Sequence, residues 1–332
     1  MNATPWTQAP TRPFLDWPIE TNPAQMSADV GIVGIPYSEP YKGDSWPNDQ
    51  THAPDALRQA SARFCDGKDQ WDFDIGADLA SVLPLRCLDY GNVPWVDGSY
   101  DTYAANVTAC LRHLWRNRTQ VLVIGGDHGV TIPALDALEV LDEPIYIVHV
   151  DAHLDWREEV GGVRRGYSSP LRWASTKPYV LGMTQIGLRG TGSARREDFE
   201  AARDYGSRIL TAEEFHALGC EHALATIPAS CSVYITIDAD GFDPTEMPGV
   251  LWPVPGGVRF HQIAPLIRAI ARRNRIVGMD IVEVAPSFDA ANHLTCVIAG
   301  RLFINAVGAS WRADGAYRRK SVEMTRETSH DS

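Results

Sequence analysis

Three stretches of the chain end an apolar run on carboxylates or imidazoles, the side chains that bind divalent metal ions. In the first, residues 233–244 read Val-Tyr-Ile-Thr-Ile-Asp-Ala-Asp-Gly-Phe-Asp-Pro, so a β-branched run is followed by Asp238, Asp240 and Asp243. Because open α/β sheets bind ligands at the carboxyl ends of their strands, and buried unpaired carboxylates are costly, this pattern indicates a bound positive charge. An acidic turn, with Asp243 and Pro244 as ordinary turn residues, is the alternative interpretation.

The second stretch carries its polar side chains at alternate positions. Residues 145–155 read Ile-Tyr-Ile-Val-His-Val-Asp-Ala-His-Leu-Asp and include Asp151, His153 and Asp155. Because side chains of an extended chain repeat with period two, these three face the same side. The third stretch ends in Gly-Gly-Asp-His and supplies His128.

These stretches provide six candidate metal ligands, which are His128, Asp151, His153, Asp155, Asp238 and Asp240. Carboxylates and imidazoles together suit Mn²⁺ or another first-row dication better than they suit metals that prefer thiolates. They also accept Ni²⁺, which lies higher than Mn²⁺ in the affinity order. The set is larger than one open metal site needs, so we expect two divalent ions bridged by a water or hydroxide.

The same three stretches resemble the signatures of the ureohydrolase family, which includes arginase, agmatinase and other hydrolases of guanidino compounds. The matching segments are Gly125-Gly-Asp-His128, Asp151-Ala-His-Leu-Asp155 and Thr236-Ile-Asp-Ala-Asp-Gly-Phe-Asp-Pro244. Further matches cover most of the chain, at residues 34–36, 89–93, 186–190, 255–257 and 278–286. The resemblance implies that the six candidate ligands hold a binuclear metal centre.

The resemblance also implies a mechanism of metal-assisted hydrolysis. Two dications would lower the pKa of a bridging water, so that a hydroxide exists near neutral pH and attacks the guanidinium carbon. Asp155 is the candidate for binding metal and orienting this nucleophile, and His153 belongs to the same catalytic group. Glu283 would bind the guanidinium, because a carboxylate accepts two parallel hydrogen bonds from it. An ordinary salt bridge at a strand end is the other interpretation of Glu283.

The chain departs from the family pattern where a proton shuttle is expected. Family members commonly carry a His-Gly step after the Asp-Ala-His-x-Asp signature, and the nearest equivalent here is Arg165-Gly166. Arginine stays protonated near neutral pH and therefore cannot shuttle protons. We expect His52, Tyr167 or water to do that work, or a leaving group that needs less help.

A second departure concerns the residues expected around the substrate. The loop at residues 37–51 lacks the family's Arg-Pro-Gly-Ala-Arg pattern and carries Tyr37, Tyr41, Trp46, Asn48 and Asp49. Bulky Leu251 and Trp252 stand where relatives have small residues, which should narrow the site. Trp252 is equally interpretable as a core or interface aromatic. The predicted substrate contacts are Glu283, Trp252, Asn48, Asp49 and Tyr167.

A narrow, aromatic and acidic pocket favours a small cation. Aromatic faces attract such cations by ~0.5–2 kcal/mol per well-placed contact. We therefore expect guanidine, an alkylguanidine or a biguanide as substrate, with agmatine or a guanidino acid as the alternative. A non-catalytic partner subunit of a hetero-oligomeric ureohydrolase, a zinc deacetylase on the related fold and a metal-dependent binding protein are the remaining interpretations.

The elements that must position these residues alternate between strand and helix. The strand-like stretches are 28–35, 88–93, 121–124, the apolar run from 145, 185–188, 233–237 and 276–282. The helix-like stretches are 53–63, 103–115, 131–141, 261–273 and 293–307. Such alternation predicts a three-layer α/β/α fold with a central, mostly parallel sheet, and the resemblance implies the arginase-like version of it.

The predicted organisation is one ureohydrolase domain at residues 28–312, between an extended arm at 1–27 and a polar tail at 313–332. The arm, rich in Pro and Trp, would lie over the surface or on a neighbouring subunit. The resemblance implies a homotrimer or homohexamer, and a hetero-oligomer with a related subunit is the alternative.

Composition limits the partners. The formal net charge of −12 argues against nucleic acid, which needs clustered Lys and Arg, and is compatible with a cationic substrate. Six cysteines without CxxC spacing indicate reduced thiols of a cytoplasmic protein. We see no signal peptide and no run approaching the ~20 apolar residues of a membrane span, so we expect a soluble protein without a membrane partner.

Overall fold

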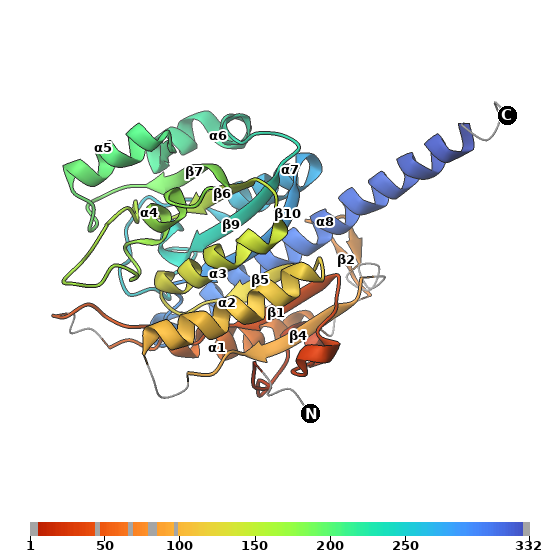
Figure 1. The fold of residues 1–332 in the computed structure, drawn as a ribbon, viewed down its shortest axis with the longest axis horizontal. Helices are drawn as coiled ribbons and strands as arrows, with labels where there is room; N and C mark the ends of the chain where they lie inside the picture. Colours follow the sequence, from red (N-terminus) through yellow and green to blue (C-terminus); the bar gives the residue numbers. More distant parts are fainter. Residues whose placement is uncertain (1–5, 44–46, 66–68, 79–84, 96–98, 328–332) are drawn as a thin grey trace.

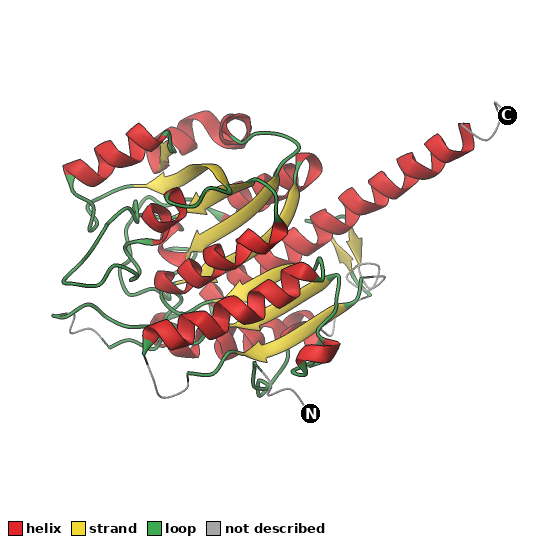
Figure 2. Cartoon of the chain, viewed as in Figure 1, coloured by secondary structure: helices red, strands yellow, loops and turns green. Residues whose placement is uncertain are grey.

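A central sheet lies between two layers of helices (Figures 1 and 2). The computed structural model describes residues 6–43, 47–65, 69–78, 85–95 and 99–327. The predicted three-layer α/β/α class is confirmed.

Within the described residues, eight strands form the main sheet in the order β4-β1-β5-β10-β9-β6-β7-β8, and all neighbours are parallel. The strands are β1 (Val30–Gly34), β4 (Cys87–Asn92), β5 (Gln120–Ile124), β6 (Ile145–Val150), β7 (Val180–Leu188), β8 (Arg208–Thr211), β9 (Ser232–Asp238) and β10 (Arg275–Val282). A separate antiparallel pair consists of β2 (Trp71–Asp72) and β3 (Ala77–Asp78). Because parallel strands end at one edge, residues that follow the adjacent strands β5, β10, β9 and β6 meet there.

The helices cover both faces of the sheet. They are α1 (Ala53–Ser61), α2 (Tyr100–Arg116), α3 (Thr131–Ala137), α4 (Pro170–Ser175), α5 (Arg196–Tyr205), α6 (Ala212–Thr226), α7 (Phe260–Arg273) and α8 (Leu294–Glu327). Short 3-10 helices are η1 (Phe14–Asp16), η2 (Pro23–Gln25), η3 (Gln50–His52), η4 (Ala62–Phe64), η6 (His128–Val130), η7 (Leu138–Leu141), η8 (Ala239–Gly241) and η9 (Pro286–Phe288). Helices α1, α6, α7 and α8 pack on one face, and α2 to α5 on the other.

Strand β5 shows why the site strands read as continuous apolar runs. All its residues are buried. Leu122 and Ile124 belong to the apolar core of one face, whereas Val121 and Val123 belong to the core of the other. Period-two alternation therefore gives each helical layer its own apolar surface, as in parallel sheets covered on both sides.

The N-terminal arm is anchored on its own chain. Phe14 is fully buried, and its ring lies edge-on to Phe303 of α8 with centroids 6.1 Å apart. Gln8 pairs antiparallel with Asn92 and thereby covers the edge strand β4. The described part of the arm thus packs into the molecule, rather than only lying over its surface. Residues 1–5 lie outside the described residues, and contact with a neighbouring subunit stays a prediction.

Most predicted elements are observed with shifted ends, but one edge of the sheet was not predicted. Strand β8 and helices α4, α5 and α6 had no prediction. In α6 the helical pattern is interrupted at Gly219, whose φ is 76°, and β8 is short and half exposed. The weak periodicity of α6 and the shortness of β8 and α4 explain three of these omissions. Helix α5 is amphipathic, and its pattern could have been recognised.

Helix α8 is longer than predicted. The prediction ended it at residue 307, whereas it runs to Glu327, through most of the segment predicted as a polar tail. Figure 1 shows its last turns projecting from the body of the molecule. Local helix propensity continues the element beyond the apolar pattern that guided the prediction. Residues 328–332 lie outside the described residues.

The prediction that no run of the chain approaches a membrane span is wrong for the first part of α8. Leu294–Arg312 has a mean hydropathy of 1.4 and is long and apolar enough to span a membrane by composition. However, 67% of this window is buried inside the protein, where α8 packs against α1 and α7. Its apolar character is therefore that of a core helix.

Candidate active site

The candidate ligands and Glu283 lie at the carboxyl ends of the four adjacent central strands. His128 follows β5 and begins η6, and Asp151 follows β6 directly. Asp238 ends β9, and Asp240 lies in η8 immediately after it. Glu283 follows β10, which lies between β5 and β9 in the sheet. Sheet order thus brings together residues that are more than a hundred positions apart in the chain.

Two groups of side chains form around Asp151. The Nδ1 atom of His128 lies 2.9 Å from Asp155 Oδ2 and 3.3 Å from Asp151 Oδ2. Asp238 Oδ2 lies 3.3 Å from the same nitrogen. On the other side, His153 Nδ1 lies 3.4 Å from Asp151 Oδ1. Asp151 therefore turns one oxygen toward each imidazole.

The second group is completed by Asp240, whose Oδ2 lies 3.1 Å from His153 Nδ1. All six predicted ligands are therefore brought together, in two groups that share Asp151. Shared carboxylates are suited to holding two cations a few ångströms apart.

The His128 imidazole has the orientation of a metal ligand. Its Nε2 lies 3.0 Å from Thr236 Oγ1, which is placed to accept the ring hydrogen. Its Nδ1 is buried and has no hydrogen-bond partner in the described part of the chain, although three carboxylates surround it. A ring nitrogen directed at three carboxylate oxygens is the arrangement expected of ligands that share a divalent cation. The residues present therefore fit a pair of divalent ions.

The electrostatics of the cluster agree with a missing positive charge. Burial, followed by the charges of Asp240 and Asp151, raises the pKa of Asp238 well above its usual value. Burial, followed by Asp151, likewise raises the pKa of Asp155. Burial also acts to raise the pKa of Asp151, but three surrounding imidazoles lower it well below the usual value. Divalent cations would stabilise the ionised form of all these carboxylates.

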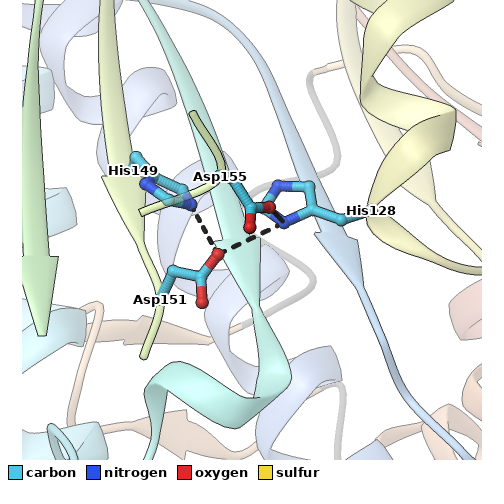
Figure 3. A group of neighbouring side chains, drawn as sticks. All are labelled: His128, His149, Asp151 and Asp155. Atoms are coloured by element: carbon cyan, nitrogen blue, oxygen red, sulfur yellow. Dashed lines mark hydrogen bonds and ion pairs between the residues drawn. The ribbon is translucent and has the colours of Figure 1, made fainter. Parts of the chain in front are cut away.

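His149 belongs to the site and was not among the predicted residues. Figure 3 shows Asp151 between His149 and His128, and His149 Nε2 lies 2.8 Å from Asp151 Oδ2. Gln185 Nε2 lies 3.1 Å from His149 Nδ1, and its amide is oriented by Ser207, which donates to the Gln185 oxygen at 2.8 Å. Because Nδ1 accepts, Nε2 carries the hydrogen and donates it to Asp151. In this arrangement His149 orients Asp151, although it also belongs to the group of side chains that could hold a metal ion.

A sequence signal for His149 existed. His149 stands two positions before Asp151, so period two places both side chains on the same side of β6 and its extension. The prediction treated position 149 as part of the strand body.

Two site residues have left-handed backbone conformations. The φ angles are 50° at Asp155 and 62° at Glu283. Non-glycine residues rarely adopt this region, and such strain gathers at functional sites. Asp155 is held there because its carbonyl oxygen accepts from Leu171 and Arg172 at the start of α4, at 3.1 and 3.2 Å.

Glu283 lies beside the metal cluster. Its Oε1 accepts a hydrogen bond of 2.7 Å from the backbone N–H of His128, and its Oε2 accepts from the amide of Gln50. Burial, followed by the Asp127 carboxylate, raises the pKa of Glu283 to about 8. A cationic ligand would reverse this shift, because it favours the charged form of the carboxylate.

Glu283 opens into a small pocket of about 30 Å³, lined by Pro40, Asn48, Gln50, Tyr167, Leu251, Trp252 and Glu283. Four of the five predicted substrate contacts therefore share one pocket, together with the bulky Leu251. Gln50 was not predicted. Asp49 is not among the lining residues, because its carboxylate turns the other way and accepts from the backbone N–H of Ser287 at 2.8 Å. Trp46 lies outside the described residues.

Arg165 is turned away from the cluster. Its guanidinium pairs with Asp101 and lies 5.0 Å from the ring centroid of Tyr100. Of the side chains predicted to replace the missing shuttle, Tyr167 lines the pocket, whereas His52 is exposed at the end of η3.

Known proteins share this architecture. The model of the arginase family matches residues 28–308. The chain is 29% identical to proclavaminate amidinohydrolase from Streptomyces clavuligerus, over 89% of this chain and 90% of the relative. It is 31% identical to an agmatinase from Sodalis glossinidius, over 87% and 89% of the two chains.

The solved structure of the Streptomyces clavuligerus enzyme superposes with a TM-score of 0.79 at 27% identity, covering 94% of this chain and 100% of that one. The match thus includes the strands, the helices and the segments that bear the metal cluster. The chain is therefore an amidinohydrolase of the arginase family, an enzyme that hydrolyses carbon–nitrogen bonds.

Proposed function

We propose that the enzyme hydrolyses a C–N bond of a small guanidino cation, such as guanidine, an alkylguanidine or a biguanide. The observation that carries this proposal is the size and lining of the pocket at Glu283, which measures about 30 Å³ and has Leu251 and Trp252 in its wall. The carboxylate supplies the negative charge, and Tyr167 and Trp252 supply aromatic faces that favour cations. A compact cation fits this space better than one with a long amine chain.

The proposed cofactors are two divalent ions, Mn²⁺ or Ni²⁺, both of which accept a mixture of carboxylate and imidazole ligands. His128, Asp151, Asp155 and Asp238 would hold one ion, and Asp151, His153 and Asp240 the other. When bound, such a pair supplies the Lewis acidity that activates water near neutral pH.

The chain's own residues would bind and orient the substrate. Glu283 accepts the guanidinium N–H groups, and its hydrogen bond from the His128 backbone ties it to a ligand of the cluster. Asp155, fixed by α4 against His128, would orient the attacking water. Because Arg165 is paired with Asp101 elsewhere, we assign proton delivery to Tyr167 or water within the pocket.

A metal-resolved activity screen tests the proposal. Protein stripped of metal and reloaded with Mn²⁺, Ni²⁺, Co²⁺ or Zn²⁺ is offered guanidine, methylguanidine, a dimethylbiguanide, agmatine, guanidinobutyrate and arginine, and the release of urea, ammonia and amine is followed. We expect turnover confined to the small guanidines or biguanides. Comparable or better turnover of agmatine would contradict the proposal.

Agmatine or a guanidino acid is the second candidate, supported by the agmatinase relative at 31% identity. Absence of turnover with every metal would instead favour a non-catalytic partner subunit. We also propose that the chain forms a homotrimer or homohexamer, or a hetero-oligomer with a related subunit. Light scattering of the purified chain, alone and after co-expression with a related subunit, tests this assembly.

A further inference from the structure

A chain of hydrogen bonds runs from the loop before α1 to Glu283. Asn48 Nδ2 donates to Ser38 Oγ at 2.7 Å, and Ser38 Oγ donates to Gln50 Oε1 at 2.8 Å. The amide nitrogen of Gln50 then donates to Glu283 Oε2. Gln50 is only 1% exposed, so water does not compete for these bonds.

The direction of this chain is set at its start. The backbone N–H of Gln50 donates to Asn48 Oδ1 at 3.0 Å, so the NH₂ end of the Asn48 amide faces Ser38. The Ser38 hydroxyl accepts from Asn48 and lies 2.8 Å from the Gln50 oxygen, to which it donates. The Asp127 carboxylate is a second acceptor for the same hydroxyl. The Gln50 amide is thereby oriented with its NH₂ group, rather than its oxygen, toward the Glu283 carboxylate.

The Glu283 carboxylate is thus held from two sides. His128 donates to Oε1 through its backbone, and Gln50 donates to Oε2 through its side chain. The left-handed φ of 62° at Glu283 is a conformation that surrounding contacts must maintain. Each oxygen retains a second lone pair for a bound guanidinium.

Gln50 also forms part of the pocket wall. It lines the cavity beside Glu283, and because its side chain is buried, its carboxamide occupies space that a smaller residue would leave open.

We infer that Gln50 is a positioning and specificity residue: it orients the Glu283 carboxylate toward an unsubstituted guanidinium end, and its bulk excludes substituents on the nitrogens that face it. This inference rests on the proposed function, since it concerns the same pocket. The selected feature of the substrate is a guanidinium group with small or no substituents at its buried end.

The test compares Gln50→Ala and Ser38→Ala with a matched control, Gln120→Ala. Gln120 is also a buried glutamine, 8% exposed, and it is the first residue of β5, away from the pocket. Its amide donates to Ser310 Oγ of α8 at 2.9 Å. For each metal-loaded protein, kcat and KM are measured for guanidine, methylguanidine and N,N′-dimethylguanidine. Calorimetric titration with guanidinium, metal content and thermal unfolding are measured on the same samples.

We expect Gln50→Ala to weaken guanidinium binding about tenfold, because the Glu283 carboxylate is no longer oriented. For the same reason, the KM for guanidine should rise by a larger factor than kcat falls. The ratio of kcat/KM for N,N′-dimethylguanidine over guanidine should rise about tenfold, because two of the three nitrogens of this compound carry a methyl group and one buried carbon is commonly worth 10–200-fold in discrimination. Ser38→Ala should shift both quantities in the same direction by less. Gln120→Ala should shift neither, and metal content should stay constant throughout.

The inference is overturned if Gln50→Ala leaves guanidinium affinity and the substrate ratio within twofold of the starting protein, or if Gln120→Ala changes them equally. If Gln50→Ala does not fold, Ser38→Ala decides, and an unchanged ratio there overturns the inference. Failure of the proposed function is distinguishable, because it is seen in the unmutated enzyme's own substrate preference. If that enzyme turns over nothing, the guanidinium titration alone still decides the role of Gln50.

Discussion

Asp151 connects the two halves of the cluster. Its two oxygens face different imidazoles, His128 and His153, and it also accepts from His149. A carboxylate with three imidazole neighbours is oriented before any cation arrives, which reduces the cost of binding one. Residues that only orient Asp151 should therefore affect metal affinity without binding metal.

Replacement of His149 tests this role. We expect His149→Ala to weaken metal affinity by about 10–100-fold, the usual effect of removing a group that orients a ligand. Competition with a chromogenic chelator measures this affinity in the stripped protein. The exposed His222 provides the control, since His222→Ala removes an imidazole away from the cluster. Unchanged affinity in His149→Ala would show that Asp151 needs no such support.

Replacement of Glu283 separates substrate binding from metal binding. Glu283→Gln should retain bound metal but lower kcat/KM for guanidine by about 100-fold or more, because losing one partner of a buried charge pair costs roughly 2–5 kcal/mol. Metal analysis and steady-state kinetics on one preparation measure both quantities. Glu143→Gln is the control, because Glu143 pairs with Arg275 at the opposite end of the sheet. Loss of metal from Glu283→Gln would instead place this carboxylate among the ligands.

Among the elements, we expect the loop bearing Trp252 to affect substrate preference and the N-terminal arm to affect stability. Trp252 lines the pocket and is 46% exposed, so it serves either the substrate or a neighbouring surface. The N-terminal arm has a different role, because its buried side chains pack against α8 in the core.

Trp252→Ala should widen the pocket and raise relative activity toward agmatine by about tenfold or more. Kinetics with paired small and long guanidino substrates measure this shift. Light scattering of the same variant examines the other interpretation of Trp252. A smaller assembly with an unchanged substrate preference would make Trp252 an interface residue.

The arm should contribute strongly to stability. Phe14→Ala should lower the free energy of unfolding by about 3–5 kcal/mol, because it leaves a cavity in the core. Urea unfolding monitored by tryptophan fluorescence measures the change. Phe73, which is 90% exposed, offers the matched control, and Phe73→Ala should have almost no effect. Equal effects in both variants would mean that the arm is not anchored through Phe14.

At the scale of the whole molecule, metal occupancy should govern stability. The chain carries a formal net charge of −12, and a concentrated part of the negative charge is buried in the cluster. Without cations, burial and mutual repulsion raise the pKa of Asp238 and Asp155, which marks an unfavourable accumulation of negative charge.

Removal of metal should therefore lower the melting temperature, and addition of Mn²⁺ or Ni²⁺ should restore it. A ligand at 100 times its Kd stabilises the folded state by about 2.7 kcal/mol. Differential scanning fluorimetry before and after chelation measures this effect. Mg²⁺ serves as the control ion, because it prefers all-oxygen sites. Identical melting curves with and without Mn²⁺ or Ni²⁺ would contradict a metal centre at this position.

The layers of the fold and the candidate ligand set were predictable from the sequence alone. Apolar runs mark the strands, and the run at 145–150 places Asp151 directly at the end of β6. The expected one-sided alternation is wrong, because the chain bends after Asp151 and Asp155 has a φ of 50°, so His153 and Asp155 lie on different sides of Asp151. The family signatures lie in the same local segments, so they could be recognised in the sequence without the structure.

Tertiary contacts determine which residues line the pocket at Glu283. Gln50 and Glu283 are 233 positions apart, and they meet because the loop before α1 closes over the end of β10. Likewise, His149 is oriented by Gln185 from the neighbouring strand, 36 positions away. Asp49 turns toward Ser287, while its neighbours Asn48 and Gln50 line the pocket. The contact between Gln50 and Glu283 depends on the spatial order β1-β5-β10, which differs from the order of the chain, so no local pattern encodes it.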